Sequence, residues 1–563
     1  MKTTDSTKTP GLRSLPSTFL ALAVSVLTLL LSTASSSLAG SATWKVSPAT
    51  GDWFTAANWT PRTIPNGPGD TATFASSNQT DVLVTTDIEV NGIVFKPRAS
   101  AFTIDFPLGA PTLIITGVGI TNNSGIVQNF APSSGNTFIT FLNSATAGSL
   151  TAFTNNGAIT FGGTSTADNA AFTNNGQVNF VNAATAGDAA FTNNALIIFE
   201  NSSTAGNGTF INPGGLIIFR SDNPVVGNVP TGGNGAFTNQ DAGFTVVDAG
   251  TGGDATFINN GGAVSGAFGA ETLFQDTGDA GNATLIANGG LDGGDGGSIQ
   301  FATASTGGTA QVEVFGNGNL DISRHDAPGL TTGSINGSGA VFLGINNLTV
   351  GTNNLGTTFS GLIQDGGTNG GTGGSLTKAG TGKLTLTKSN TYTGGTVITE
   401  GTLLITNTSG SATGTGSVQV NAGILGGTGI ISGAVNVATG MSAATLLPGS
   451  ATIPGTLTMQ SKLTFNARAT YQFVINSSTP VADEVVANGV TINRSAQFTF
   501  TDLGTAVLPT GTVFIVVSNT SAKPIAGAFA NLADRSTFTA GSNTFQANYR
   551  GGDGNDLTLT VVH

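Results

Sequence analysis

A repeated phrase in the middle of this chain constrains its fold more than any other feature. A nineteen-residue step separates four phenylalanines: Phe153, Phe172, Phe191 and Phe210. The first three open the phrase Phe-Thr-Asn-Asn and the last opens Phe-Ile-Asn-Pro. A fixed period near twenty residues is the sequence signature of a solenoid, in which each repeat stacks on the next.

Within each repeat, two apolar residues follow the phrase with one residue between them, as Ile159 and Phe161 do. In an extended strand such a pair points to one face, which we assign to the core. The Asn and Gly residues before the pair predict a tight turn, because both tolerate left-handed backbone. We therefore predict an all-β fold, a right-handed parallel β-helix (β-solenoid) with an N-terminal cap, in which the phenylalanines form an internal column.

The period lengthens after residue 210, because Phe237 follows Phe210 by 27 residues and Leu285 follows Phe257 by 28. The extra residues fall in polar, Gly-rich stretches at 223–235 and 262–269. We expect both to project as loops from one side of the solenoid, where repeat proteins commonly form binding surfaces.

The first residues resemble an export signal. A basic start with Lys2, Lys8 and Arg13 precedes an apolar run over 19–31 and the small residues before position 40. Residues 1–39 are therefore predicted to be a signal peptide. No later segment has the length and apolarity of a membrane-spanning helix.

Composition excludes several classes of partner and chemistry. The chain has a net charge of −12, which makes nucleic acid and anionic lipid poor partners. It has no cysteine, which excludes disulfides, thiol nucleophiles and thiolate metal sites. Its two histidines, His325 and His563, provide almost no material for a His-based triad or a multi-histidine metal site.

One segment resembles a known family. Residues 376–386 read Leu-Thr-Lys-Ala-Gly-Thr-Gly-Lys-Leu-Thr-Leu, and Asn-Thr-Tyr-Thr-Gly-Gly-Thr follows from residue 390. With Glu-Gly-Thr-Leu at 400–403, this is similar to the autotransporter-associated β-strand repeat. The resemblance implies an exported bacterial β-helix of the passenger type, secreted or at the surface of a Gram-negative-type cell. Such passengers often precede a membrane barrel of about a dozen strands, and we expect residues 456–563 to be too short for one.

These observations predict five regions. A signal peptide at 1–39 precedes a capping region at 40–110, which holds Trp44, Trp53 and Trp59. Coils with the short period occupy 111–330, further coils occupy 331–455 and include the repeat at 376–403, and a C-terminal β region covers 456–563. The tryptophans are interpreted either as a cap on the open end of the solenoid or as a platform that stacks on sugar rings.

Three groups of residues invite a chemical interpretation. Ser323, Arg324, His325 and Asp326 are adjacent, but sequence neighbours rarely form a catalytic group. The segment 551–556, Gly-Gly-Asp-Gly-Asn-Asp, matches the start of a calcium-binding nonapeptide in a single copy, and we favour a polar turn. Six aspartates gather in the Gly-rich middle: Asp248, Asp254, Asp276, Asp279, Asp292 and Asp295.

Polysaccharide-cleaving β-helices use carboxylates from adjacent coils together with a basic residue. No Lys or Arg lies between Arg220 and Arg324, so we interpret the six aspartates as solvated turn residues. The sequence thus predicts an exported structural or adhesive protein with no catalytic, cofactor-binding or metal-binding residues and no cofactor. A cell-surface or extracellular glycan is the candidate partner. The alternative is a polysaccharide-active β-helix enzyme, a lyase or glycoside hydrolase.

Overall fold

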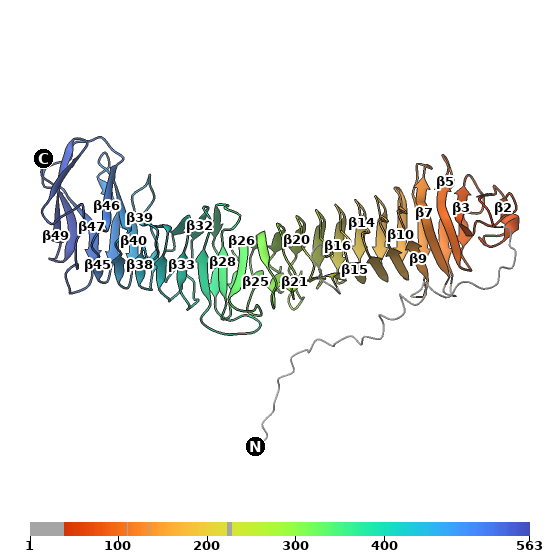
Figure 1. Ribbon diagram of the computed structural model, residues 1–563, viewed down its shortest axis with the longest axis horizontal. Coiled ribbons are helices and arrows are strands. Elements are labelled where there is room, and N and C mark those ends of the chain that lie inside the picture. Colours follow the sequence, from red (N-terminus) through yellow and green to blue (C-terminus); the bar gives the residue numbers. More distant parts are fainter. Residues whose placement is uncertain (1–38, 108, 110, 134–135, 222–227) are drawn as a thin grey trace, which may run out of the picture.

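The computed structural model describes residues 39–563, apart from 108, 110, 134–135 and 222–227. The chain forms an elongated stack of coils whose two ends lie far apart (Figure 1). The prediction of an all-β parallel β-helix is confirmed, because successive coils add parallel strands to shared sheets. The predicted signal peptide lies outside the described residues except for Ala39, which bridges to Ile64.

The first sheet has sixteen strands and forms one side of the coils from the N-terminal end. Its members are β1 (Ala42–Trp44), β2 (Trp59–Thr60), β3 (Gly67–Phe74), β5 (Ile88–Phe95), β7 (Thr112–Asn122), β9 (Phe138–Phe141), β11 (Ala158–Phe161), β13 (Gln177–Phe180), β15 (Leu196–Glu200), β17 (Leu216–Arg220), β19 (Phe244–Asp248), β21 (Glu271–Gln275), β23 (Ser298–Phe301), β25 (Asn319–Asp321), β27 (Ala340–Phe342) and β30 (Leu362–Gln364). A 3₁₀ turn, η2 (Ala56–Asn58), precedes β2.

The second sheet forms another side and divides at β26 into two rows of strands. Before the division it contains β4 (Asp81–Leu83), β6 (Thr103–Phe106), β8 (Gln128–Pro132), β10 (Thr151–Asn155), β12 (Ala171–Asn174), β14 (Ala190–Asn193), β16 (Thr209–Pro213), β18 (Ala236–Gln240), β20 (Thr256–Asn259), β22 (Thr284–Ala287), β24 (Gly307–Val314) and β26 (Gly329–Gly337). One row continues with β28 (Asn347–Val350), β31 (Ser375–Lys378), β33 (Thr396–Ile398), β35 (Val418–Val420), β38 (Val435–Val437), β41 (Leu463–Phe465) and β45 (Val490–Ile492). The other continues with β29 (Thr357–Phe359), β32 (Lys383–Leu386), β34 (Thr402–Ile405), β36 (Gly423–Gly427), β39 (Ala444–Pro448), β42 (Ala469–Asn476) with its hairpin partner β43 (Val481–Ala482), and β46 (Gln497–Asp502).

A third sheet of seven strands lies at the C-terminal end. It contains β37 (Ile430–Ile431), β40 (Thr456–Met459), β44 (Glu484–Ala487), β47 (Val513–Asn519), β50 (Asp556–Val561), β49 (Asn543–Gly551) and β48 (Thr537–Ala540). Strands β37 to β47 are parallel, whereas β50, β49 and β48 pair antiparallel. The reversal ends the parallel stacking, because an antiparallel hairpin now occupies the next position.

The phenylalanines form the predicted internal column. Rings of Phe153, Phe172, Phe191 and Phe210 stack with centroids 4.7, 4.5 and 4.8 Å apart and are almost completely buried. This spacing matches the distance between paired strands, so each coil adds one ring. A second column on the first sheet stacks in the same way and meets the first edge to face.

The asparagine that follows each Phe-Thr is a core residue, and the predicted tight turn lies directly after it. Asn155 and Asn174 are the last residues of β10 and β12 and are fully buried. Asn155 Oδ1 accepts from Gly157 N in the bend at 156–157, whose backbone is not left-handed. The left-handed positions of these coils are instead at the corner after the first sheet, for example Asp168 and Gly187. The sequence alone does not reveal that this amide is buried, because Asn suits both environments: it tolerates a turn, and it can donate and accept along a stack.

Tryptophans close the N-terminal end. Trp44, Trp53 and Trp59 are buried, and the ring centroid of Trp59 lies 4.9 Å from that of Trp44 and 5.2 Å from that of Trp53. Phe74 continues the aromatic packing from the tryptophans into the first coils. Each indole N–H donates to a backbone carbonyl. The rings therefore pack as a cap, and their faces are not open for stacking on a sugar.

The two long insertions leave the solenoid at different corners, which corrects the prediction of a single loop-bearing side. Residues 223–235, partly outside the described residues, follow β17 of the first sheet, whereas 262–269 follow β20 of the second. The second insertion also bonds to the next coil, since Gly262 N donates to Asp295 O and Asp295 N to Ala267 O. Phenylalanine spacing reveals an insertion but not the corner at which it occurs.

Candidate functional site

The first sheet ends and the third begins across two coils of the solenoid. Strand β30 is the last of the first sheet, and the same side resumes as strand only at β37. Between them, backbone bonds pass through non-strand segments: Thr391 N to Ile363 O (3.0 Å), Asn390 N to Ser411 O (2.7 Å) and Ala412 N to Ile430 O (3.0 Å). The stack is therefore continuous, although two coils on this side lack a strand.

The side chain of Asn390 replaces part of the missing strand. It is buried, its Oδ1 accepts from Ile363 N at 2.7 Å, and its Nδ2 donates to Ala412 O at 2.5 Å. One amide thus satisfies a donor in the coil before and an acceptor in the coil after. Buried backbone groups left without such partners would be costly.

Lys378 points inward at the end of β31 and is buried. Its Nζ donates to Ala379 O (2.6 Å), Gly380 O (2.8 Å) and Glu400 O (3.4 Å). Burial lowers the pKa of this amine to about 8, and the charge of Glu400 opposes the shift. Gly401 is required beside it, because a Cβ there would come within 2.9 Å of Nζ and 2.4 Å of two carbonyl oxygens.

Tyr392 fills the interior of the same coil. The ring is fully buried and its hydroxyl lies 2.6 Å from Thr396 Oγ1. Burial raises the pKa of this phenol well above its usual value, so the hydroxyl stays protonated. Lys378, Asn390 and Tyr392 therefore hold this coil together, and none of them faces an open cleft.

Residues 376–405 match the family model described as passenger-associated-transport-repeat. The chain carries this repeat. The resemblance noted at 376–403 is confirmed, and the repeat coincides with β31 to β34, where the first sheet is interrupted. Lys378, Asn390 and Tyr392, the three buried groups described above, all lie within it.

Comparison with solved structures finds the Haemophilus influenzae Hap adhesin at 11% identity and a TM-score of 0.27, over 89% of this chain. The chain spans 65% of the length of that adhesin. No curated protein matches the chain.

The adjacent Ser323, His325 and Asp326 do not form a catalytic group. Ser323 Oγ accepts from Asn369 N at 2.9 Å, whereas the two ring nitrogens of His325 lie 2.6 Å from Ser305 O and 2.7 Å from Asp326 O. Serine and histidine thus hold different loops.

Most aspartates of the middle region are turn residues, as interpreted from the sequence. Asp254 Oδ1 accepts from Asn282 Nδ2, and Asp279 Oδ1 accepts from Thr306 Oγ1, both between adjacent coils. Asp292 and Asp295 are exposed in the turn that packs on residues 262–267. Each therefore occupies a corner position rather than a shared groove.

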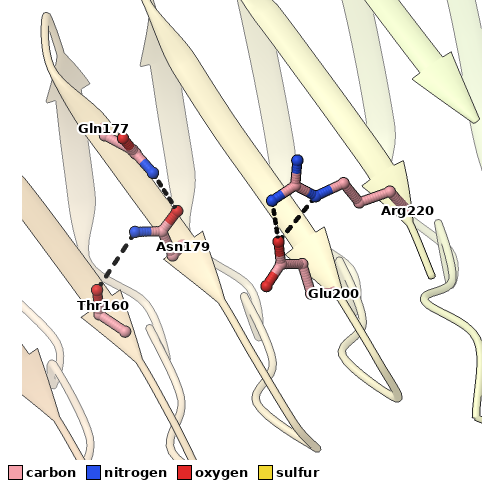
Figure 2. A network of polar contacts seen from close by, with 5 residues as sticks. All are labelled: Thr160, Gln177, Asn179, Glu200 and Arg220. Carbon is pink, nitrogen blue, oxygen red and sulfur yellow. Dashed lines mark hydrogen bonds and ion pairs between the residues drawn. The ribbon is translucent and has the colours of Figure 1, made fainter. Parts of the chain in front are cut away.

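Asp248 differs, because stacking brings basic and acidic residues beside it. In-register pairing aligns Glu200, Arg220, Asp248 and Gln275 on adjacent strands of the first sheet. Arg220 Nε donates to Glu200 Oε1 at 2.8 Å and Nη2 forms an ion pair with the same oxygen (Figure 2). Burial raises the pKa of Asp248 to about 6, and a hydrogen bond to Asp276 and repulsion from its charge add to this shift. A hydrogen bond to Gln275 and the charge of Arg220 oppose it.

A basic residue lies beside Asp248 in space, although none occurs between 220 and 324 in the sequence. Coil stacking places Arg220 next to Asp248 in space, although Arg220 is committed to Glu200. Figure 2 also shows Asn179, which pairs with Ile198 and therefore lies two residues before this row; it donates to Thr160 Oγ1 and accepts from Gln177 Nε2. The Asn179–Thr160 and Arg220–Glu200 contacts join neighbouring strands, so both stabilise the sheet surface.

The outward face beside this row is aliphatic. In-register pairs place Ile198 against Ile218 and Val246 against Leu273, all on outward positions of β15 to β21. Leu196 and Leu216 pair in the same way two residues earlier on their strands. The surface over these coils is therefore not a groove lined by carboxylates.

Glu271 is a candidate acid that sequence reasoning missed. Burial raises its pKa to about 7; Arg324 lowers it and Asp321 raises it further. Asp321 itself accepts from Thr368 N, Thr368 Oγ1 and Ser323 N at 2.7–2.8 Å. No sequence signal identifies Glu271, because these neighbours come from other coils and from the loop before β31.

The segment 551–556 is the turn of an antiparallel hairpin between β49 and β50. Asp556 is buried and its Oδ1 accepts from Asn519 N at 2.8 Å. A calcium-binding β-roll needs parallel coils that share ions between repeats, whereas β49 and β50 pair antiparallel. Among the residues that the structure describes, no three His, Cys, Asp or Glu side chains gather as a metal site, and no helix is long and apolar enough to cross a membrane.

Proposed function

We propose that this chain is an exported protein with a structural or adhesive role at or beyond the cell envelope of a Gram-negative-type bacterium. The observation that carries the proposal is the passenger-associated-transport-repeat at 376–405, embedded in a continuous parallel solenoid. The apolar and basic residues at 1–39 support export.

The contacts that the polar residues make support a role without catalysis. The buried asparagines, the buried lysine and most of the aspartates satisfy backbone groups or neighbouring coils. Catalytic carboxylates of glycosidases are held about 5–9.5 Å apart across a substrate groove. Asp248 and Asp276 interact directly instead, and Asp321 is enclosed by a loop.

An extracellular glycan is the partner that we favour. The acidic chain disfavours anionic polymers, and its outer surface is rich in Asn, Thr and Gln amide and hydroxyl groups, which bind sugar hydroxyls.

A glycan array with the full exported chain tests adhesion, and a reducing-sugar assay on the bound glycans tests catalysis. We expect binding without sugar release. Glu271 favours the rival activity, a glycoside hydrolase or lyase, since a carboxyl with a pKa near 7 suits a general acid. Sugar release that disappears in Glu271→Gln, but persists in the turn variant Asp254→Asn, would replace the adhesive proposal with the enzymatic one.

Localisation is tested separately by cell fractionation. The proposal expects the processed chain in the outer-membrane or extracellular fraction. An unprocessed chain confined to the cytoplasm would contradict it.

A further inference from the structure

A cavity of about 310 Å³ lies near the C-terminal end of the solenoid. It is lined by Phe500, Asp502, Gly504, Thr505, Ala540, Gly541, Ser542 and Asn543. Strand β46 forms one wall and the turn between β48 and β49 forms the other. This volume is at the lower end of the range of ligand pockets, roughly 300–1,000 Å³.

The wall formed by β46 has unpaired backbone groups. Its only pairing partner among the described strands is β42. Leu503 N donates to Ile475 O of β42, so the odd-numbered residues direct their backbone groups toward β42. Backbone groups alternate along a strand, so those of Phe498, Phe500 and Asp502 point to the other edge. Phe498 confirms this direction. Its N–H donates to Asn531 Oδ1 at 2.9 Å, and its C=O accepts from Asn531 Nδ2 at 2.7 Å.

The open edge is short. Asn531 closes it at Phe498, and Asn543 closes the other end by accepting from Leu508 N (2.7 Å) and donating to Ala506 O (2.9 Å). Only the stretch from Phe500 to Asp502 remains, about 7 Å at 3.3 Å per residue. A peptide strand needs a longer continuous edge, so the cavity favours a compact ligand.

The remaining groups match a sugar ring. Asp502 Oδ1 accepts from Ser477 N and Gly504 N, whereas Oδ2 has no hydrogen-bond partner among the described residues. Phe500 is half-buried against Phe545 and Phe538 and is one of the residues that line the cavity. Free carboxylate, hydroxyl and backbone groups beside an aromatic surface bind the hydroxyls and the C–H face of a sugar.

Charge restricts the sugar further. The lining contains Asp502 and no Lys, Arg or His, within a chain of net charge −12. An acidic sugar or a phosphate would face an uncompensated carboxylate.

We propose that this cavity binds a single neutral sugar residue at the end of a glycan. The inference rests on the adhesive function proposed above and gives it a location. Asp502 Oδ2 and the Phe500 and Asp502 backbone groups bind the hydroxyls, and the Phe500 ring packs on the ring carbons.

The test measures binding of methyl glycosides of glucose, galactose, mannose and N-acetylglucosamine to the full exported chain, by saturation-transfer NMR and calorimetry. Asp502→Asn keeps the Oδ1 acceptor but replaces the free oxygen, and we expect at least about tenfold weaker binding, or about 1.4 kcal/mol. Ser542→Trp fills the mouth from an exposed turn, and we expect it to abolish binding. Ser409→Trp, in an exposed turn after β34, is the control.

Binding of one of these glycosides that both cavity variants weaken and the control retains would support the site. Glycan-array binding that neither variant changes would overturn the site but leave the adhesive function standing. An array without any binding would remove the glycan-adhesive function and the site together. If no glycoside binds and the peptide acetyl-Val-Thr-Val-amide does, the sugar assignment is wrong. The edge of β46 would then bind a peptide as an additional strand.

Discussion

Asn155 Nδ2 donates to Asn174 Oδ1 at 2.8 Å, one coil further along the solenoid. The same bond repeats from Asn174 through Asn193, Asn212 and Asn239 to Asn259 at 2.7–2.8 Å. The ladder ends where Ala287 pairs with Asn259, and the Nδ2 of Asn259 has no acceptor. A buried amide ladder therefore runs beside the phenylalanine column and fixes the register of each coil.

Breaking this ladder is expected to destabilise the adjacent coils. Asn174→Ala leaves the Nδ2 of Asn155 without its Asn174 acceptor and the Oδ1 of Asn193 without its Asn174 donor. Each unsatisfied buried group costs about 1–3 kcal/mol. The neighbouring Asn175→Ala removes only exposed contacts to Asn156 and Asn194 and should cost less than about 0.5 kcal/mol. Native-state hydrogen exchange measures both, and equal effects would contradict a structural role for the ladder.

The aromatic column allows a second comparison, between a buried and an exposed residue. Phe172→Ala opens a void between Phe153 and Phe191 and should cost about 3–5 kcal/mol locally. Asp254→Ala changes an exposed turn and should cost less than about 0.5 kcal/mol. Because a solenoid can unfold in stages, exchange rates of the β12 amides are a better readout than one denaturant midpoint. Similar losses of local stability in the two variants would show that the phenylalanine column is not the core.

Within the passenger-associated-transport-repeat, two lysines of the same motif should differ. Lys378→Met leaves the carbonyls of Ala379, Gly380 and Glu400 without this donor, and we expect a loss of about 1–3 kcal/mol. Lys383→Met alters an exposed position and serves as the matched control. Protease resistance of residues 376–405 reports the effect, and an unchanged Lys378→Met variant would show that the lysine is dispensable.

The raised pKa of Glu271 predicts that the stability of the fold depends on pH. Its pKa is raised from 4.5 to about 7 on folding, so between these values the folded state holds the proton more tightly than the unfolded state. Its stabilising contribution is therefore complete below pH 4.5 and is lost as the pH rises through 7. Thermal unfolding of Glu271→Gln should lack this component of the pH profile. A profile identical to that of the unaltered chain would show that Glu271 does not titrate in this window.

The sequence predicted the fold well where the period is short and failed where coils exchange contacts. The nineteen-residue step identified the parallel stacking and the column through Phe172, because one strand spacing follows directly from one period. It could not reveal that Asn390 replaces a strand, since the partners of its amide lie in the preceding and following coils. The C-terminal cavity depends on where β46 stops pairing, and no local pattern encodes that edge.

In-register stacking of the nineteen-residue coils is the central claim, and disulfide trapping tests it most directly. Thr173 and Thr192 are paired partners on β12 and β14, and the chain has no native cysteine to interfere. The double variant Thr173→Cys, Thr192→Cys should crosslink under mild oxidation, because partners on adjacent strands lie within the roughly 4.4–6.8 Å Cα separation that a disulfide allows. Thr173→Cys with Ile211→Cys, two strands apart and therefore about 9.6 Å distant, should not. Crosslinking of the second pair, or none of the first, would contradict the stacked register.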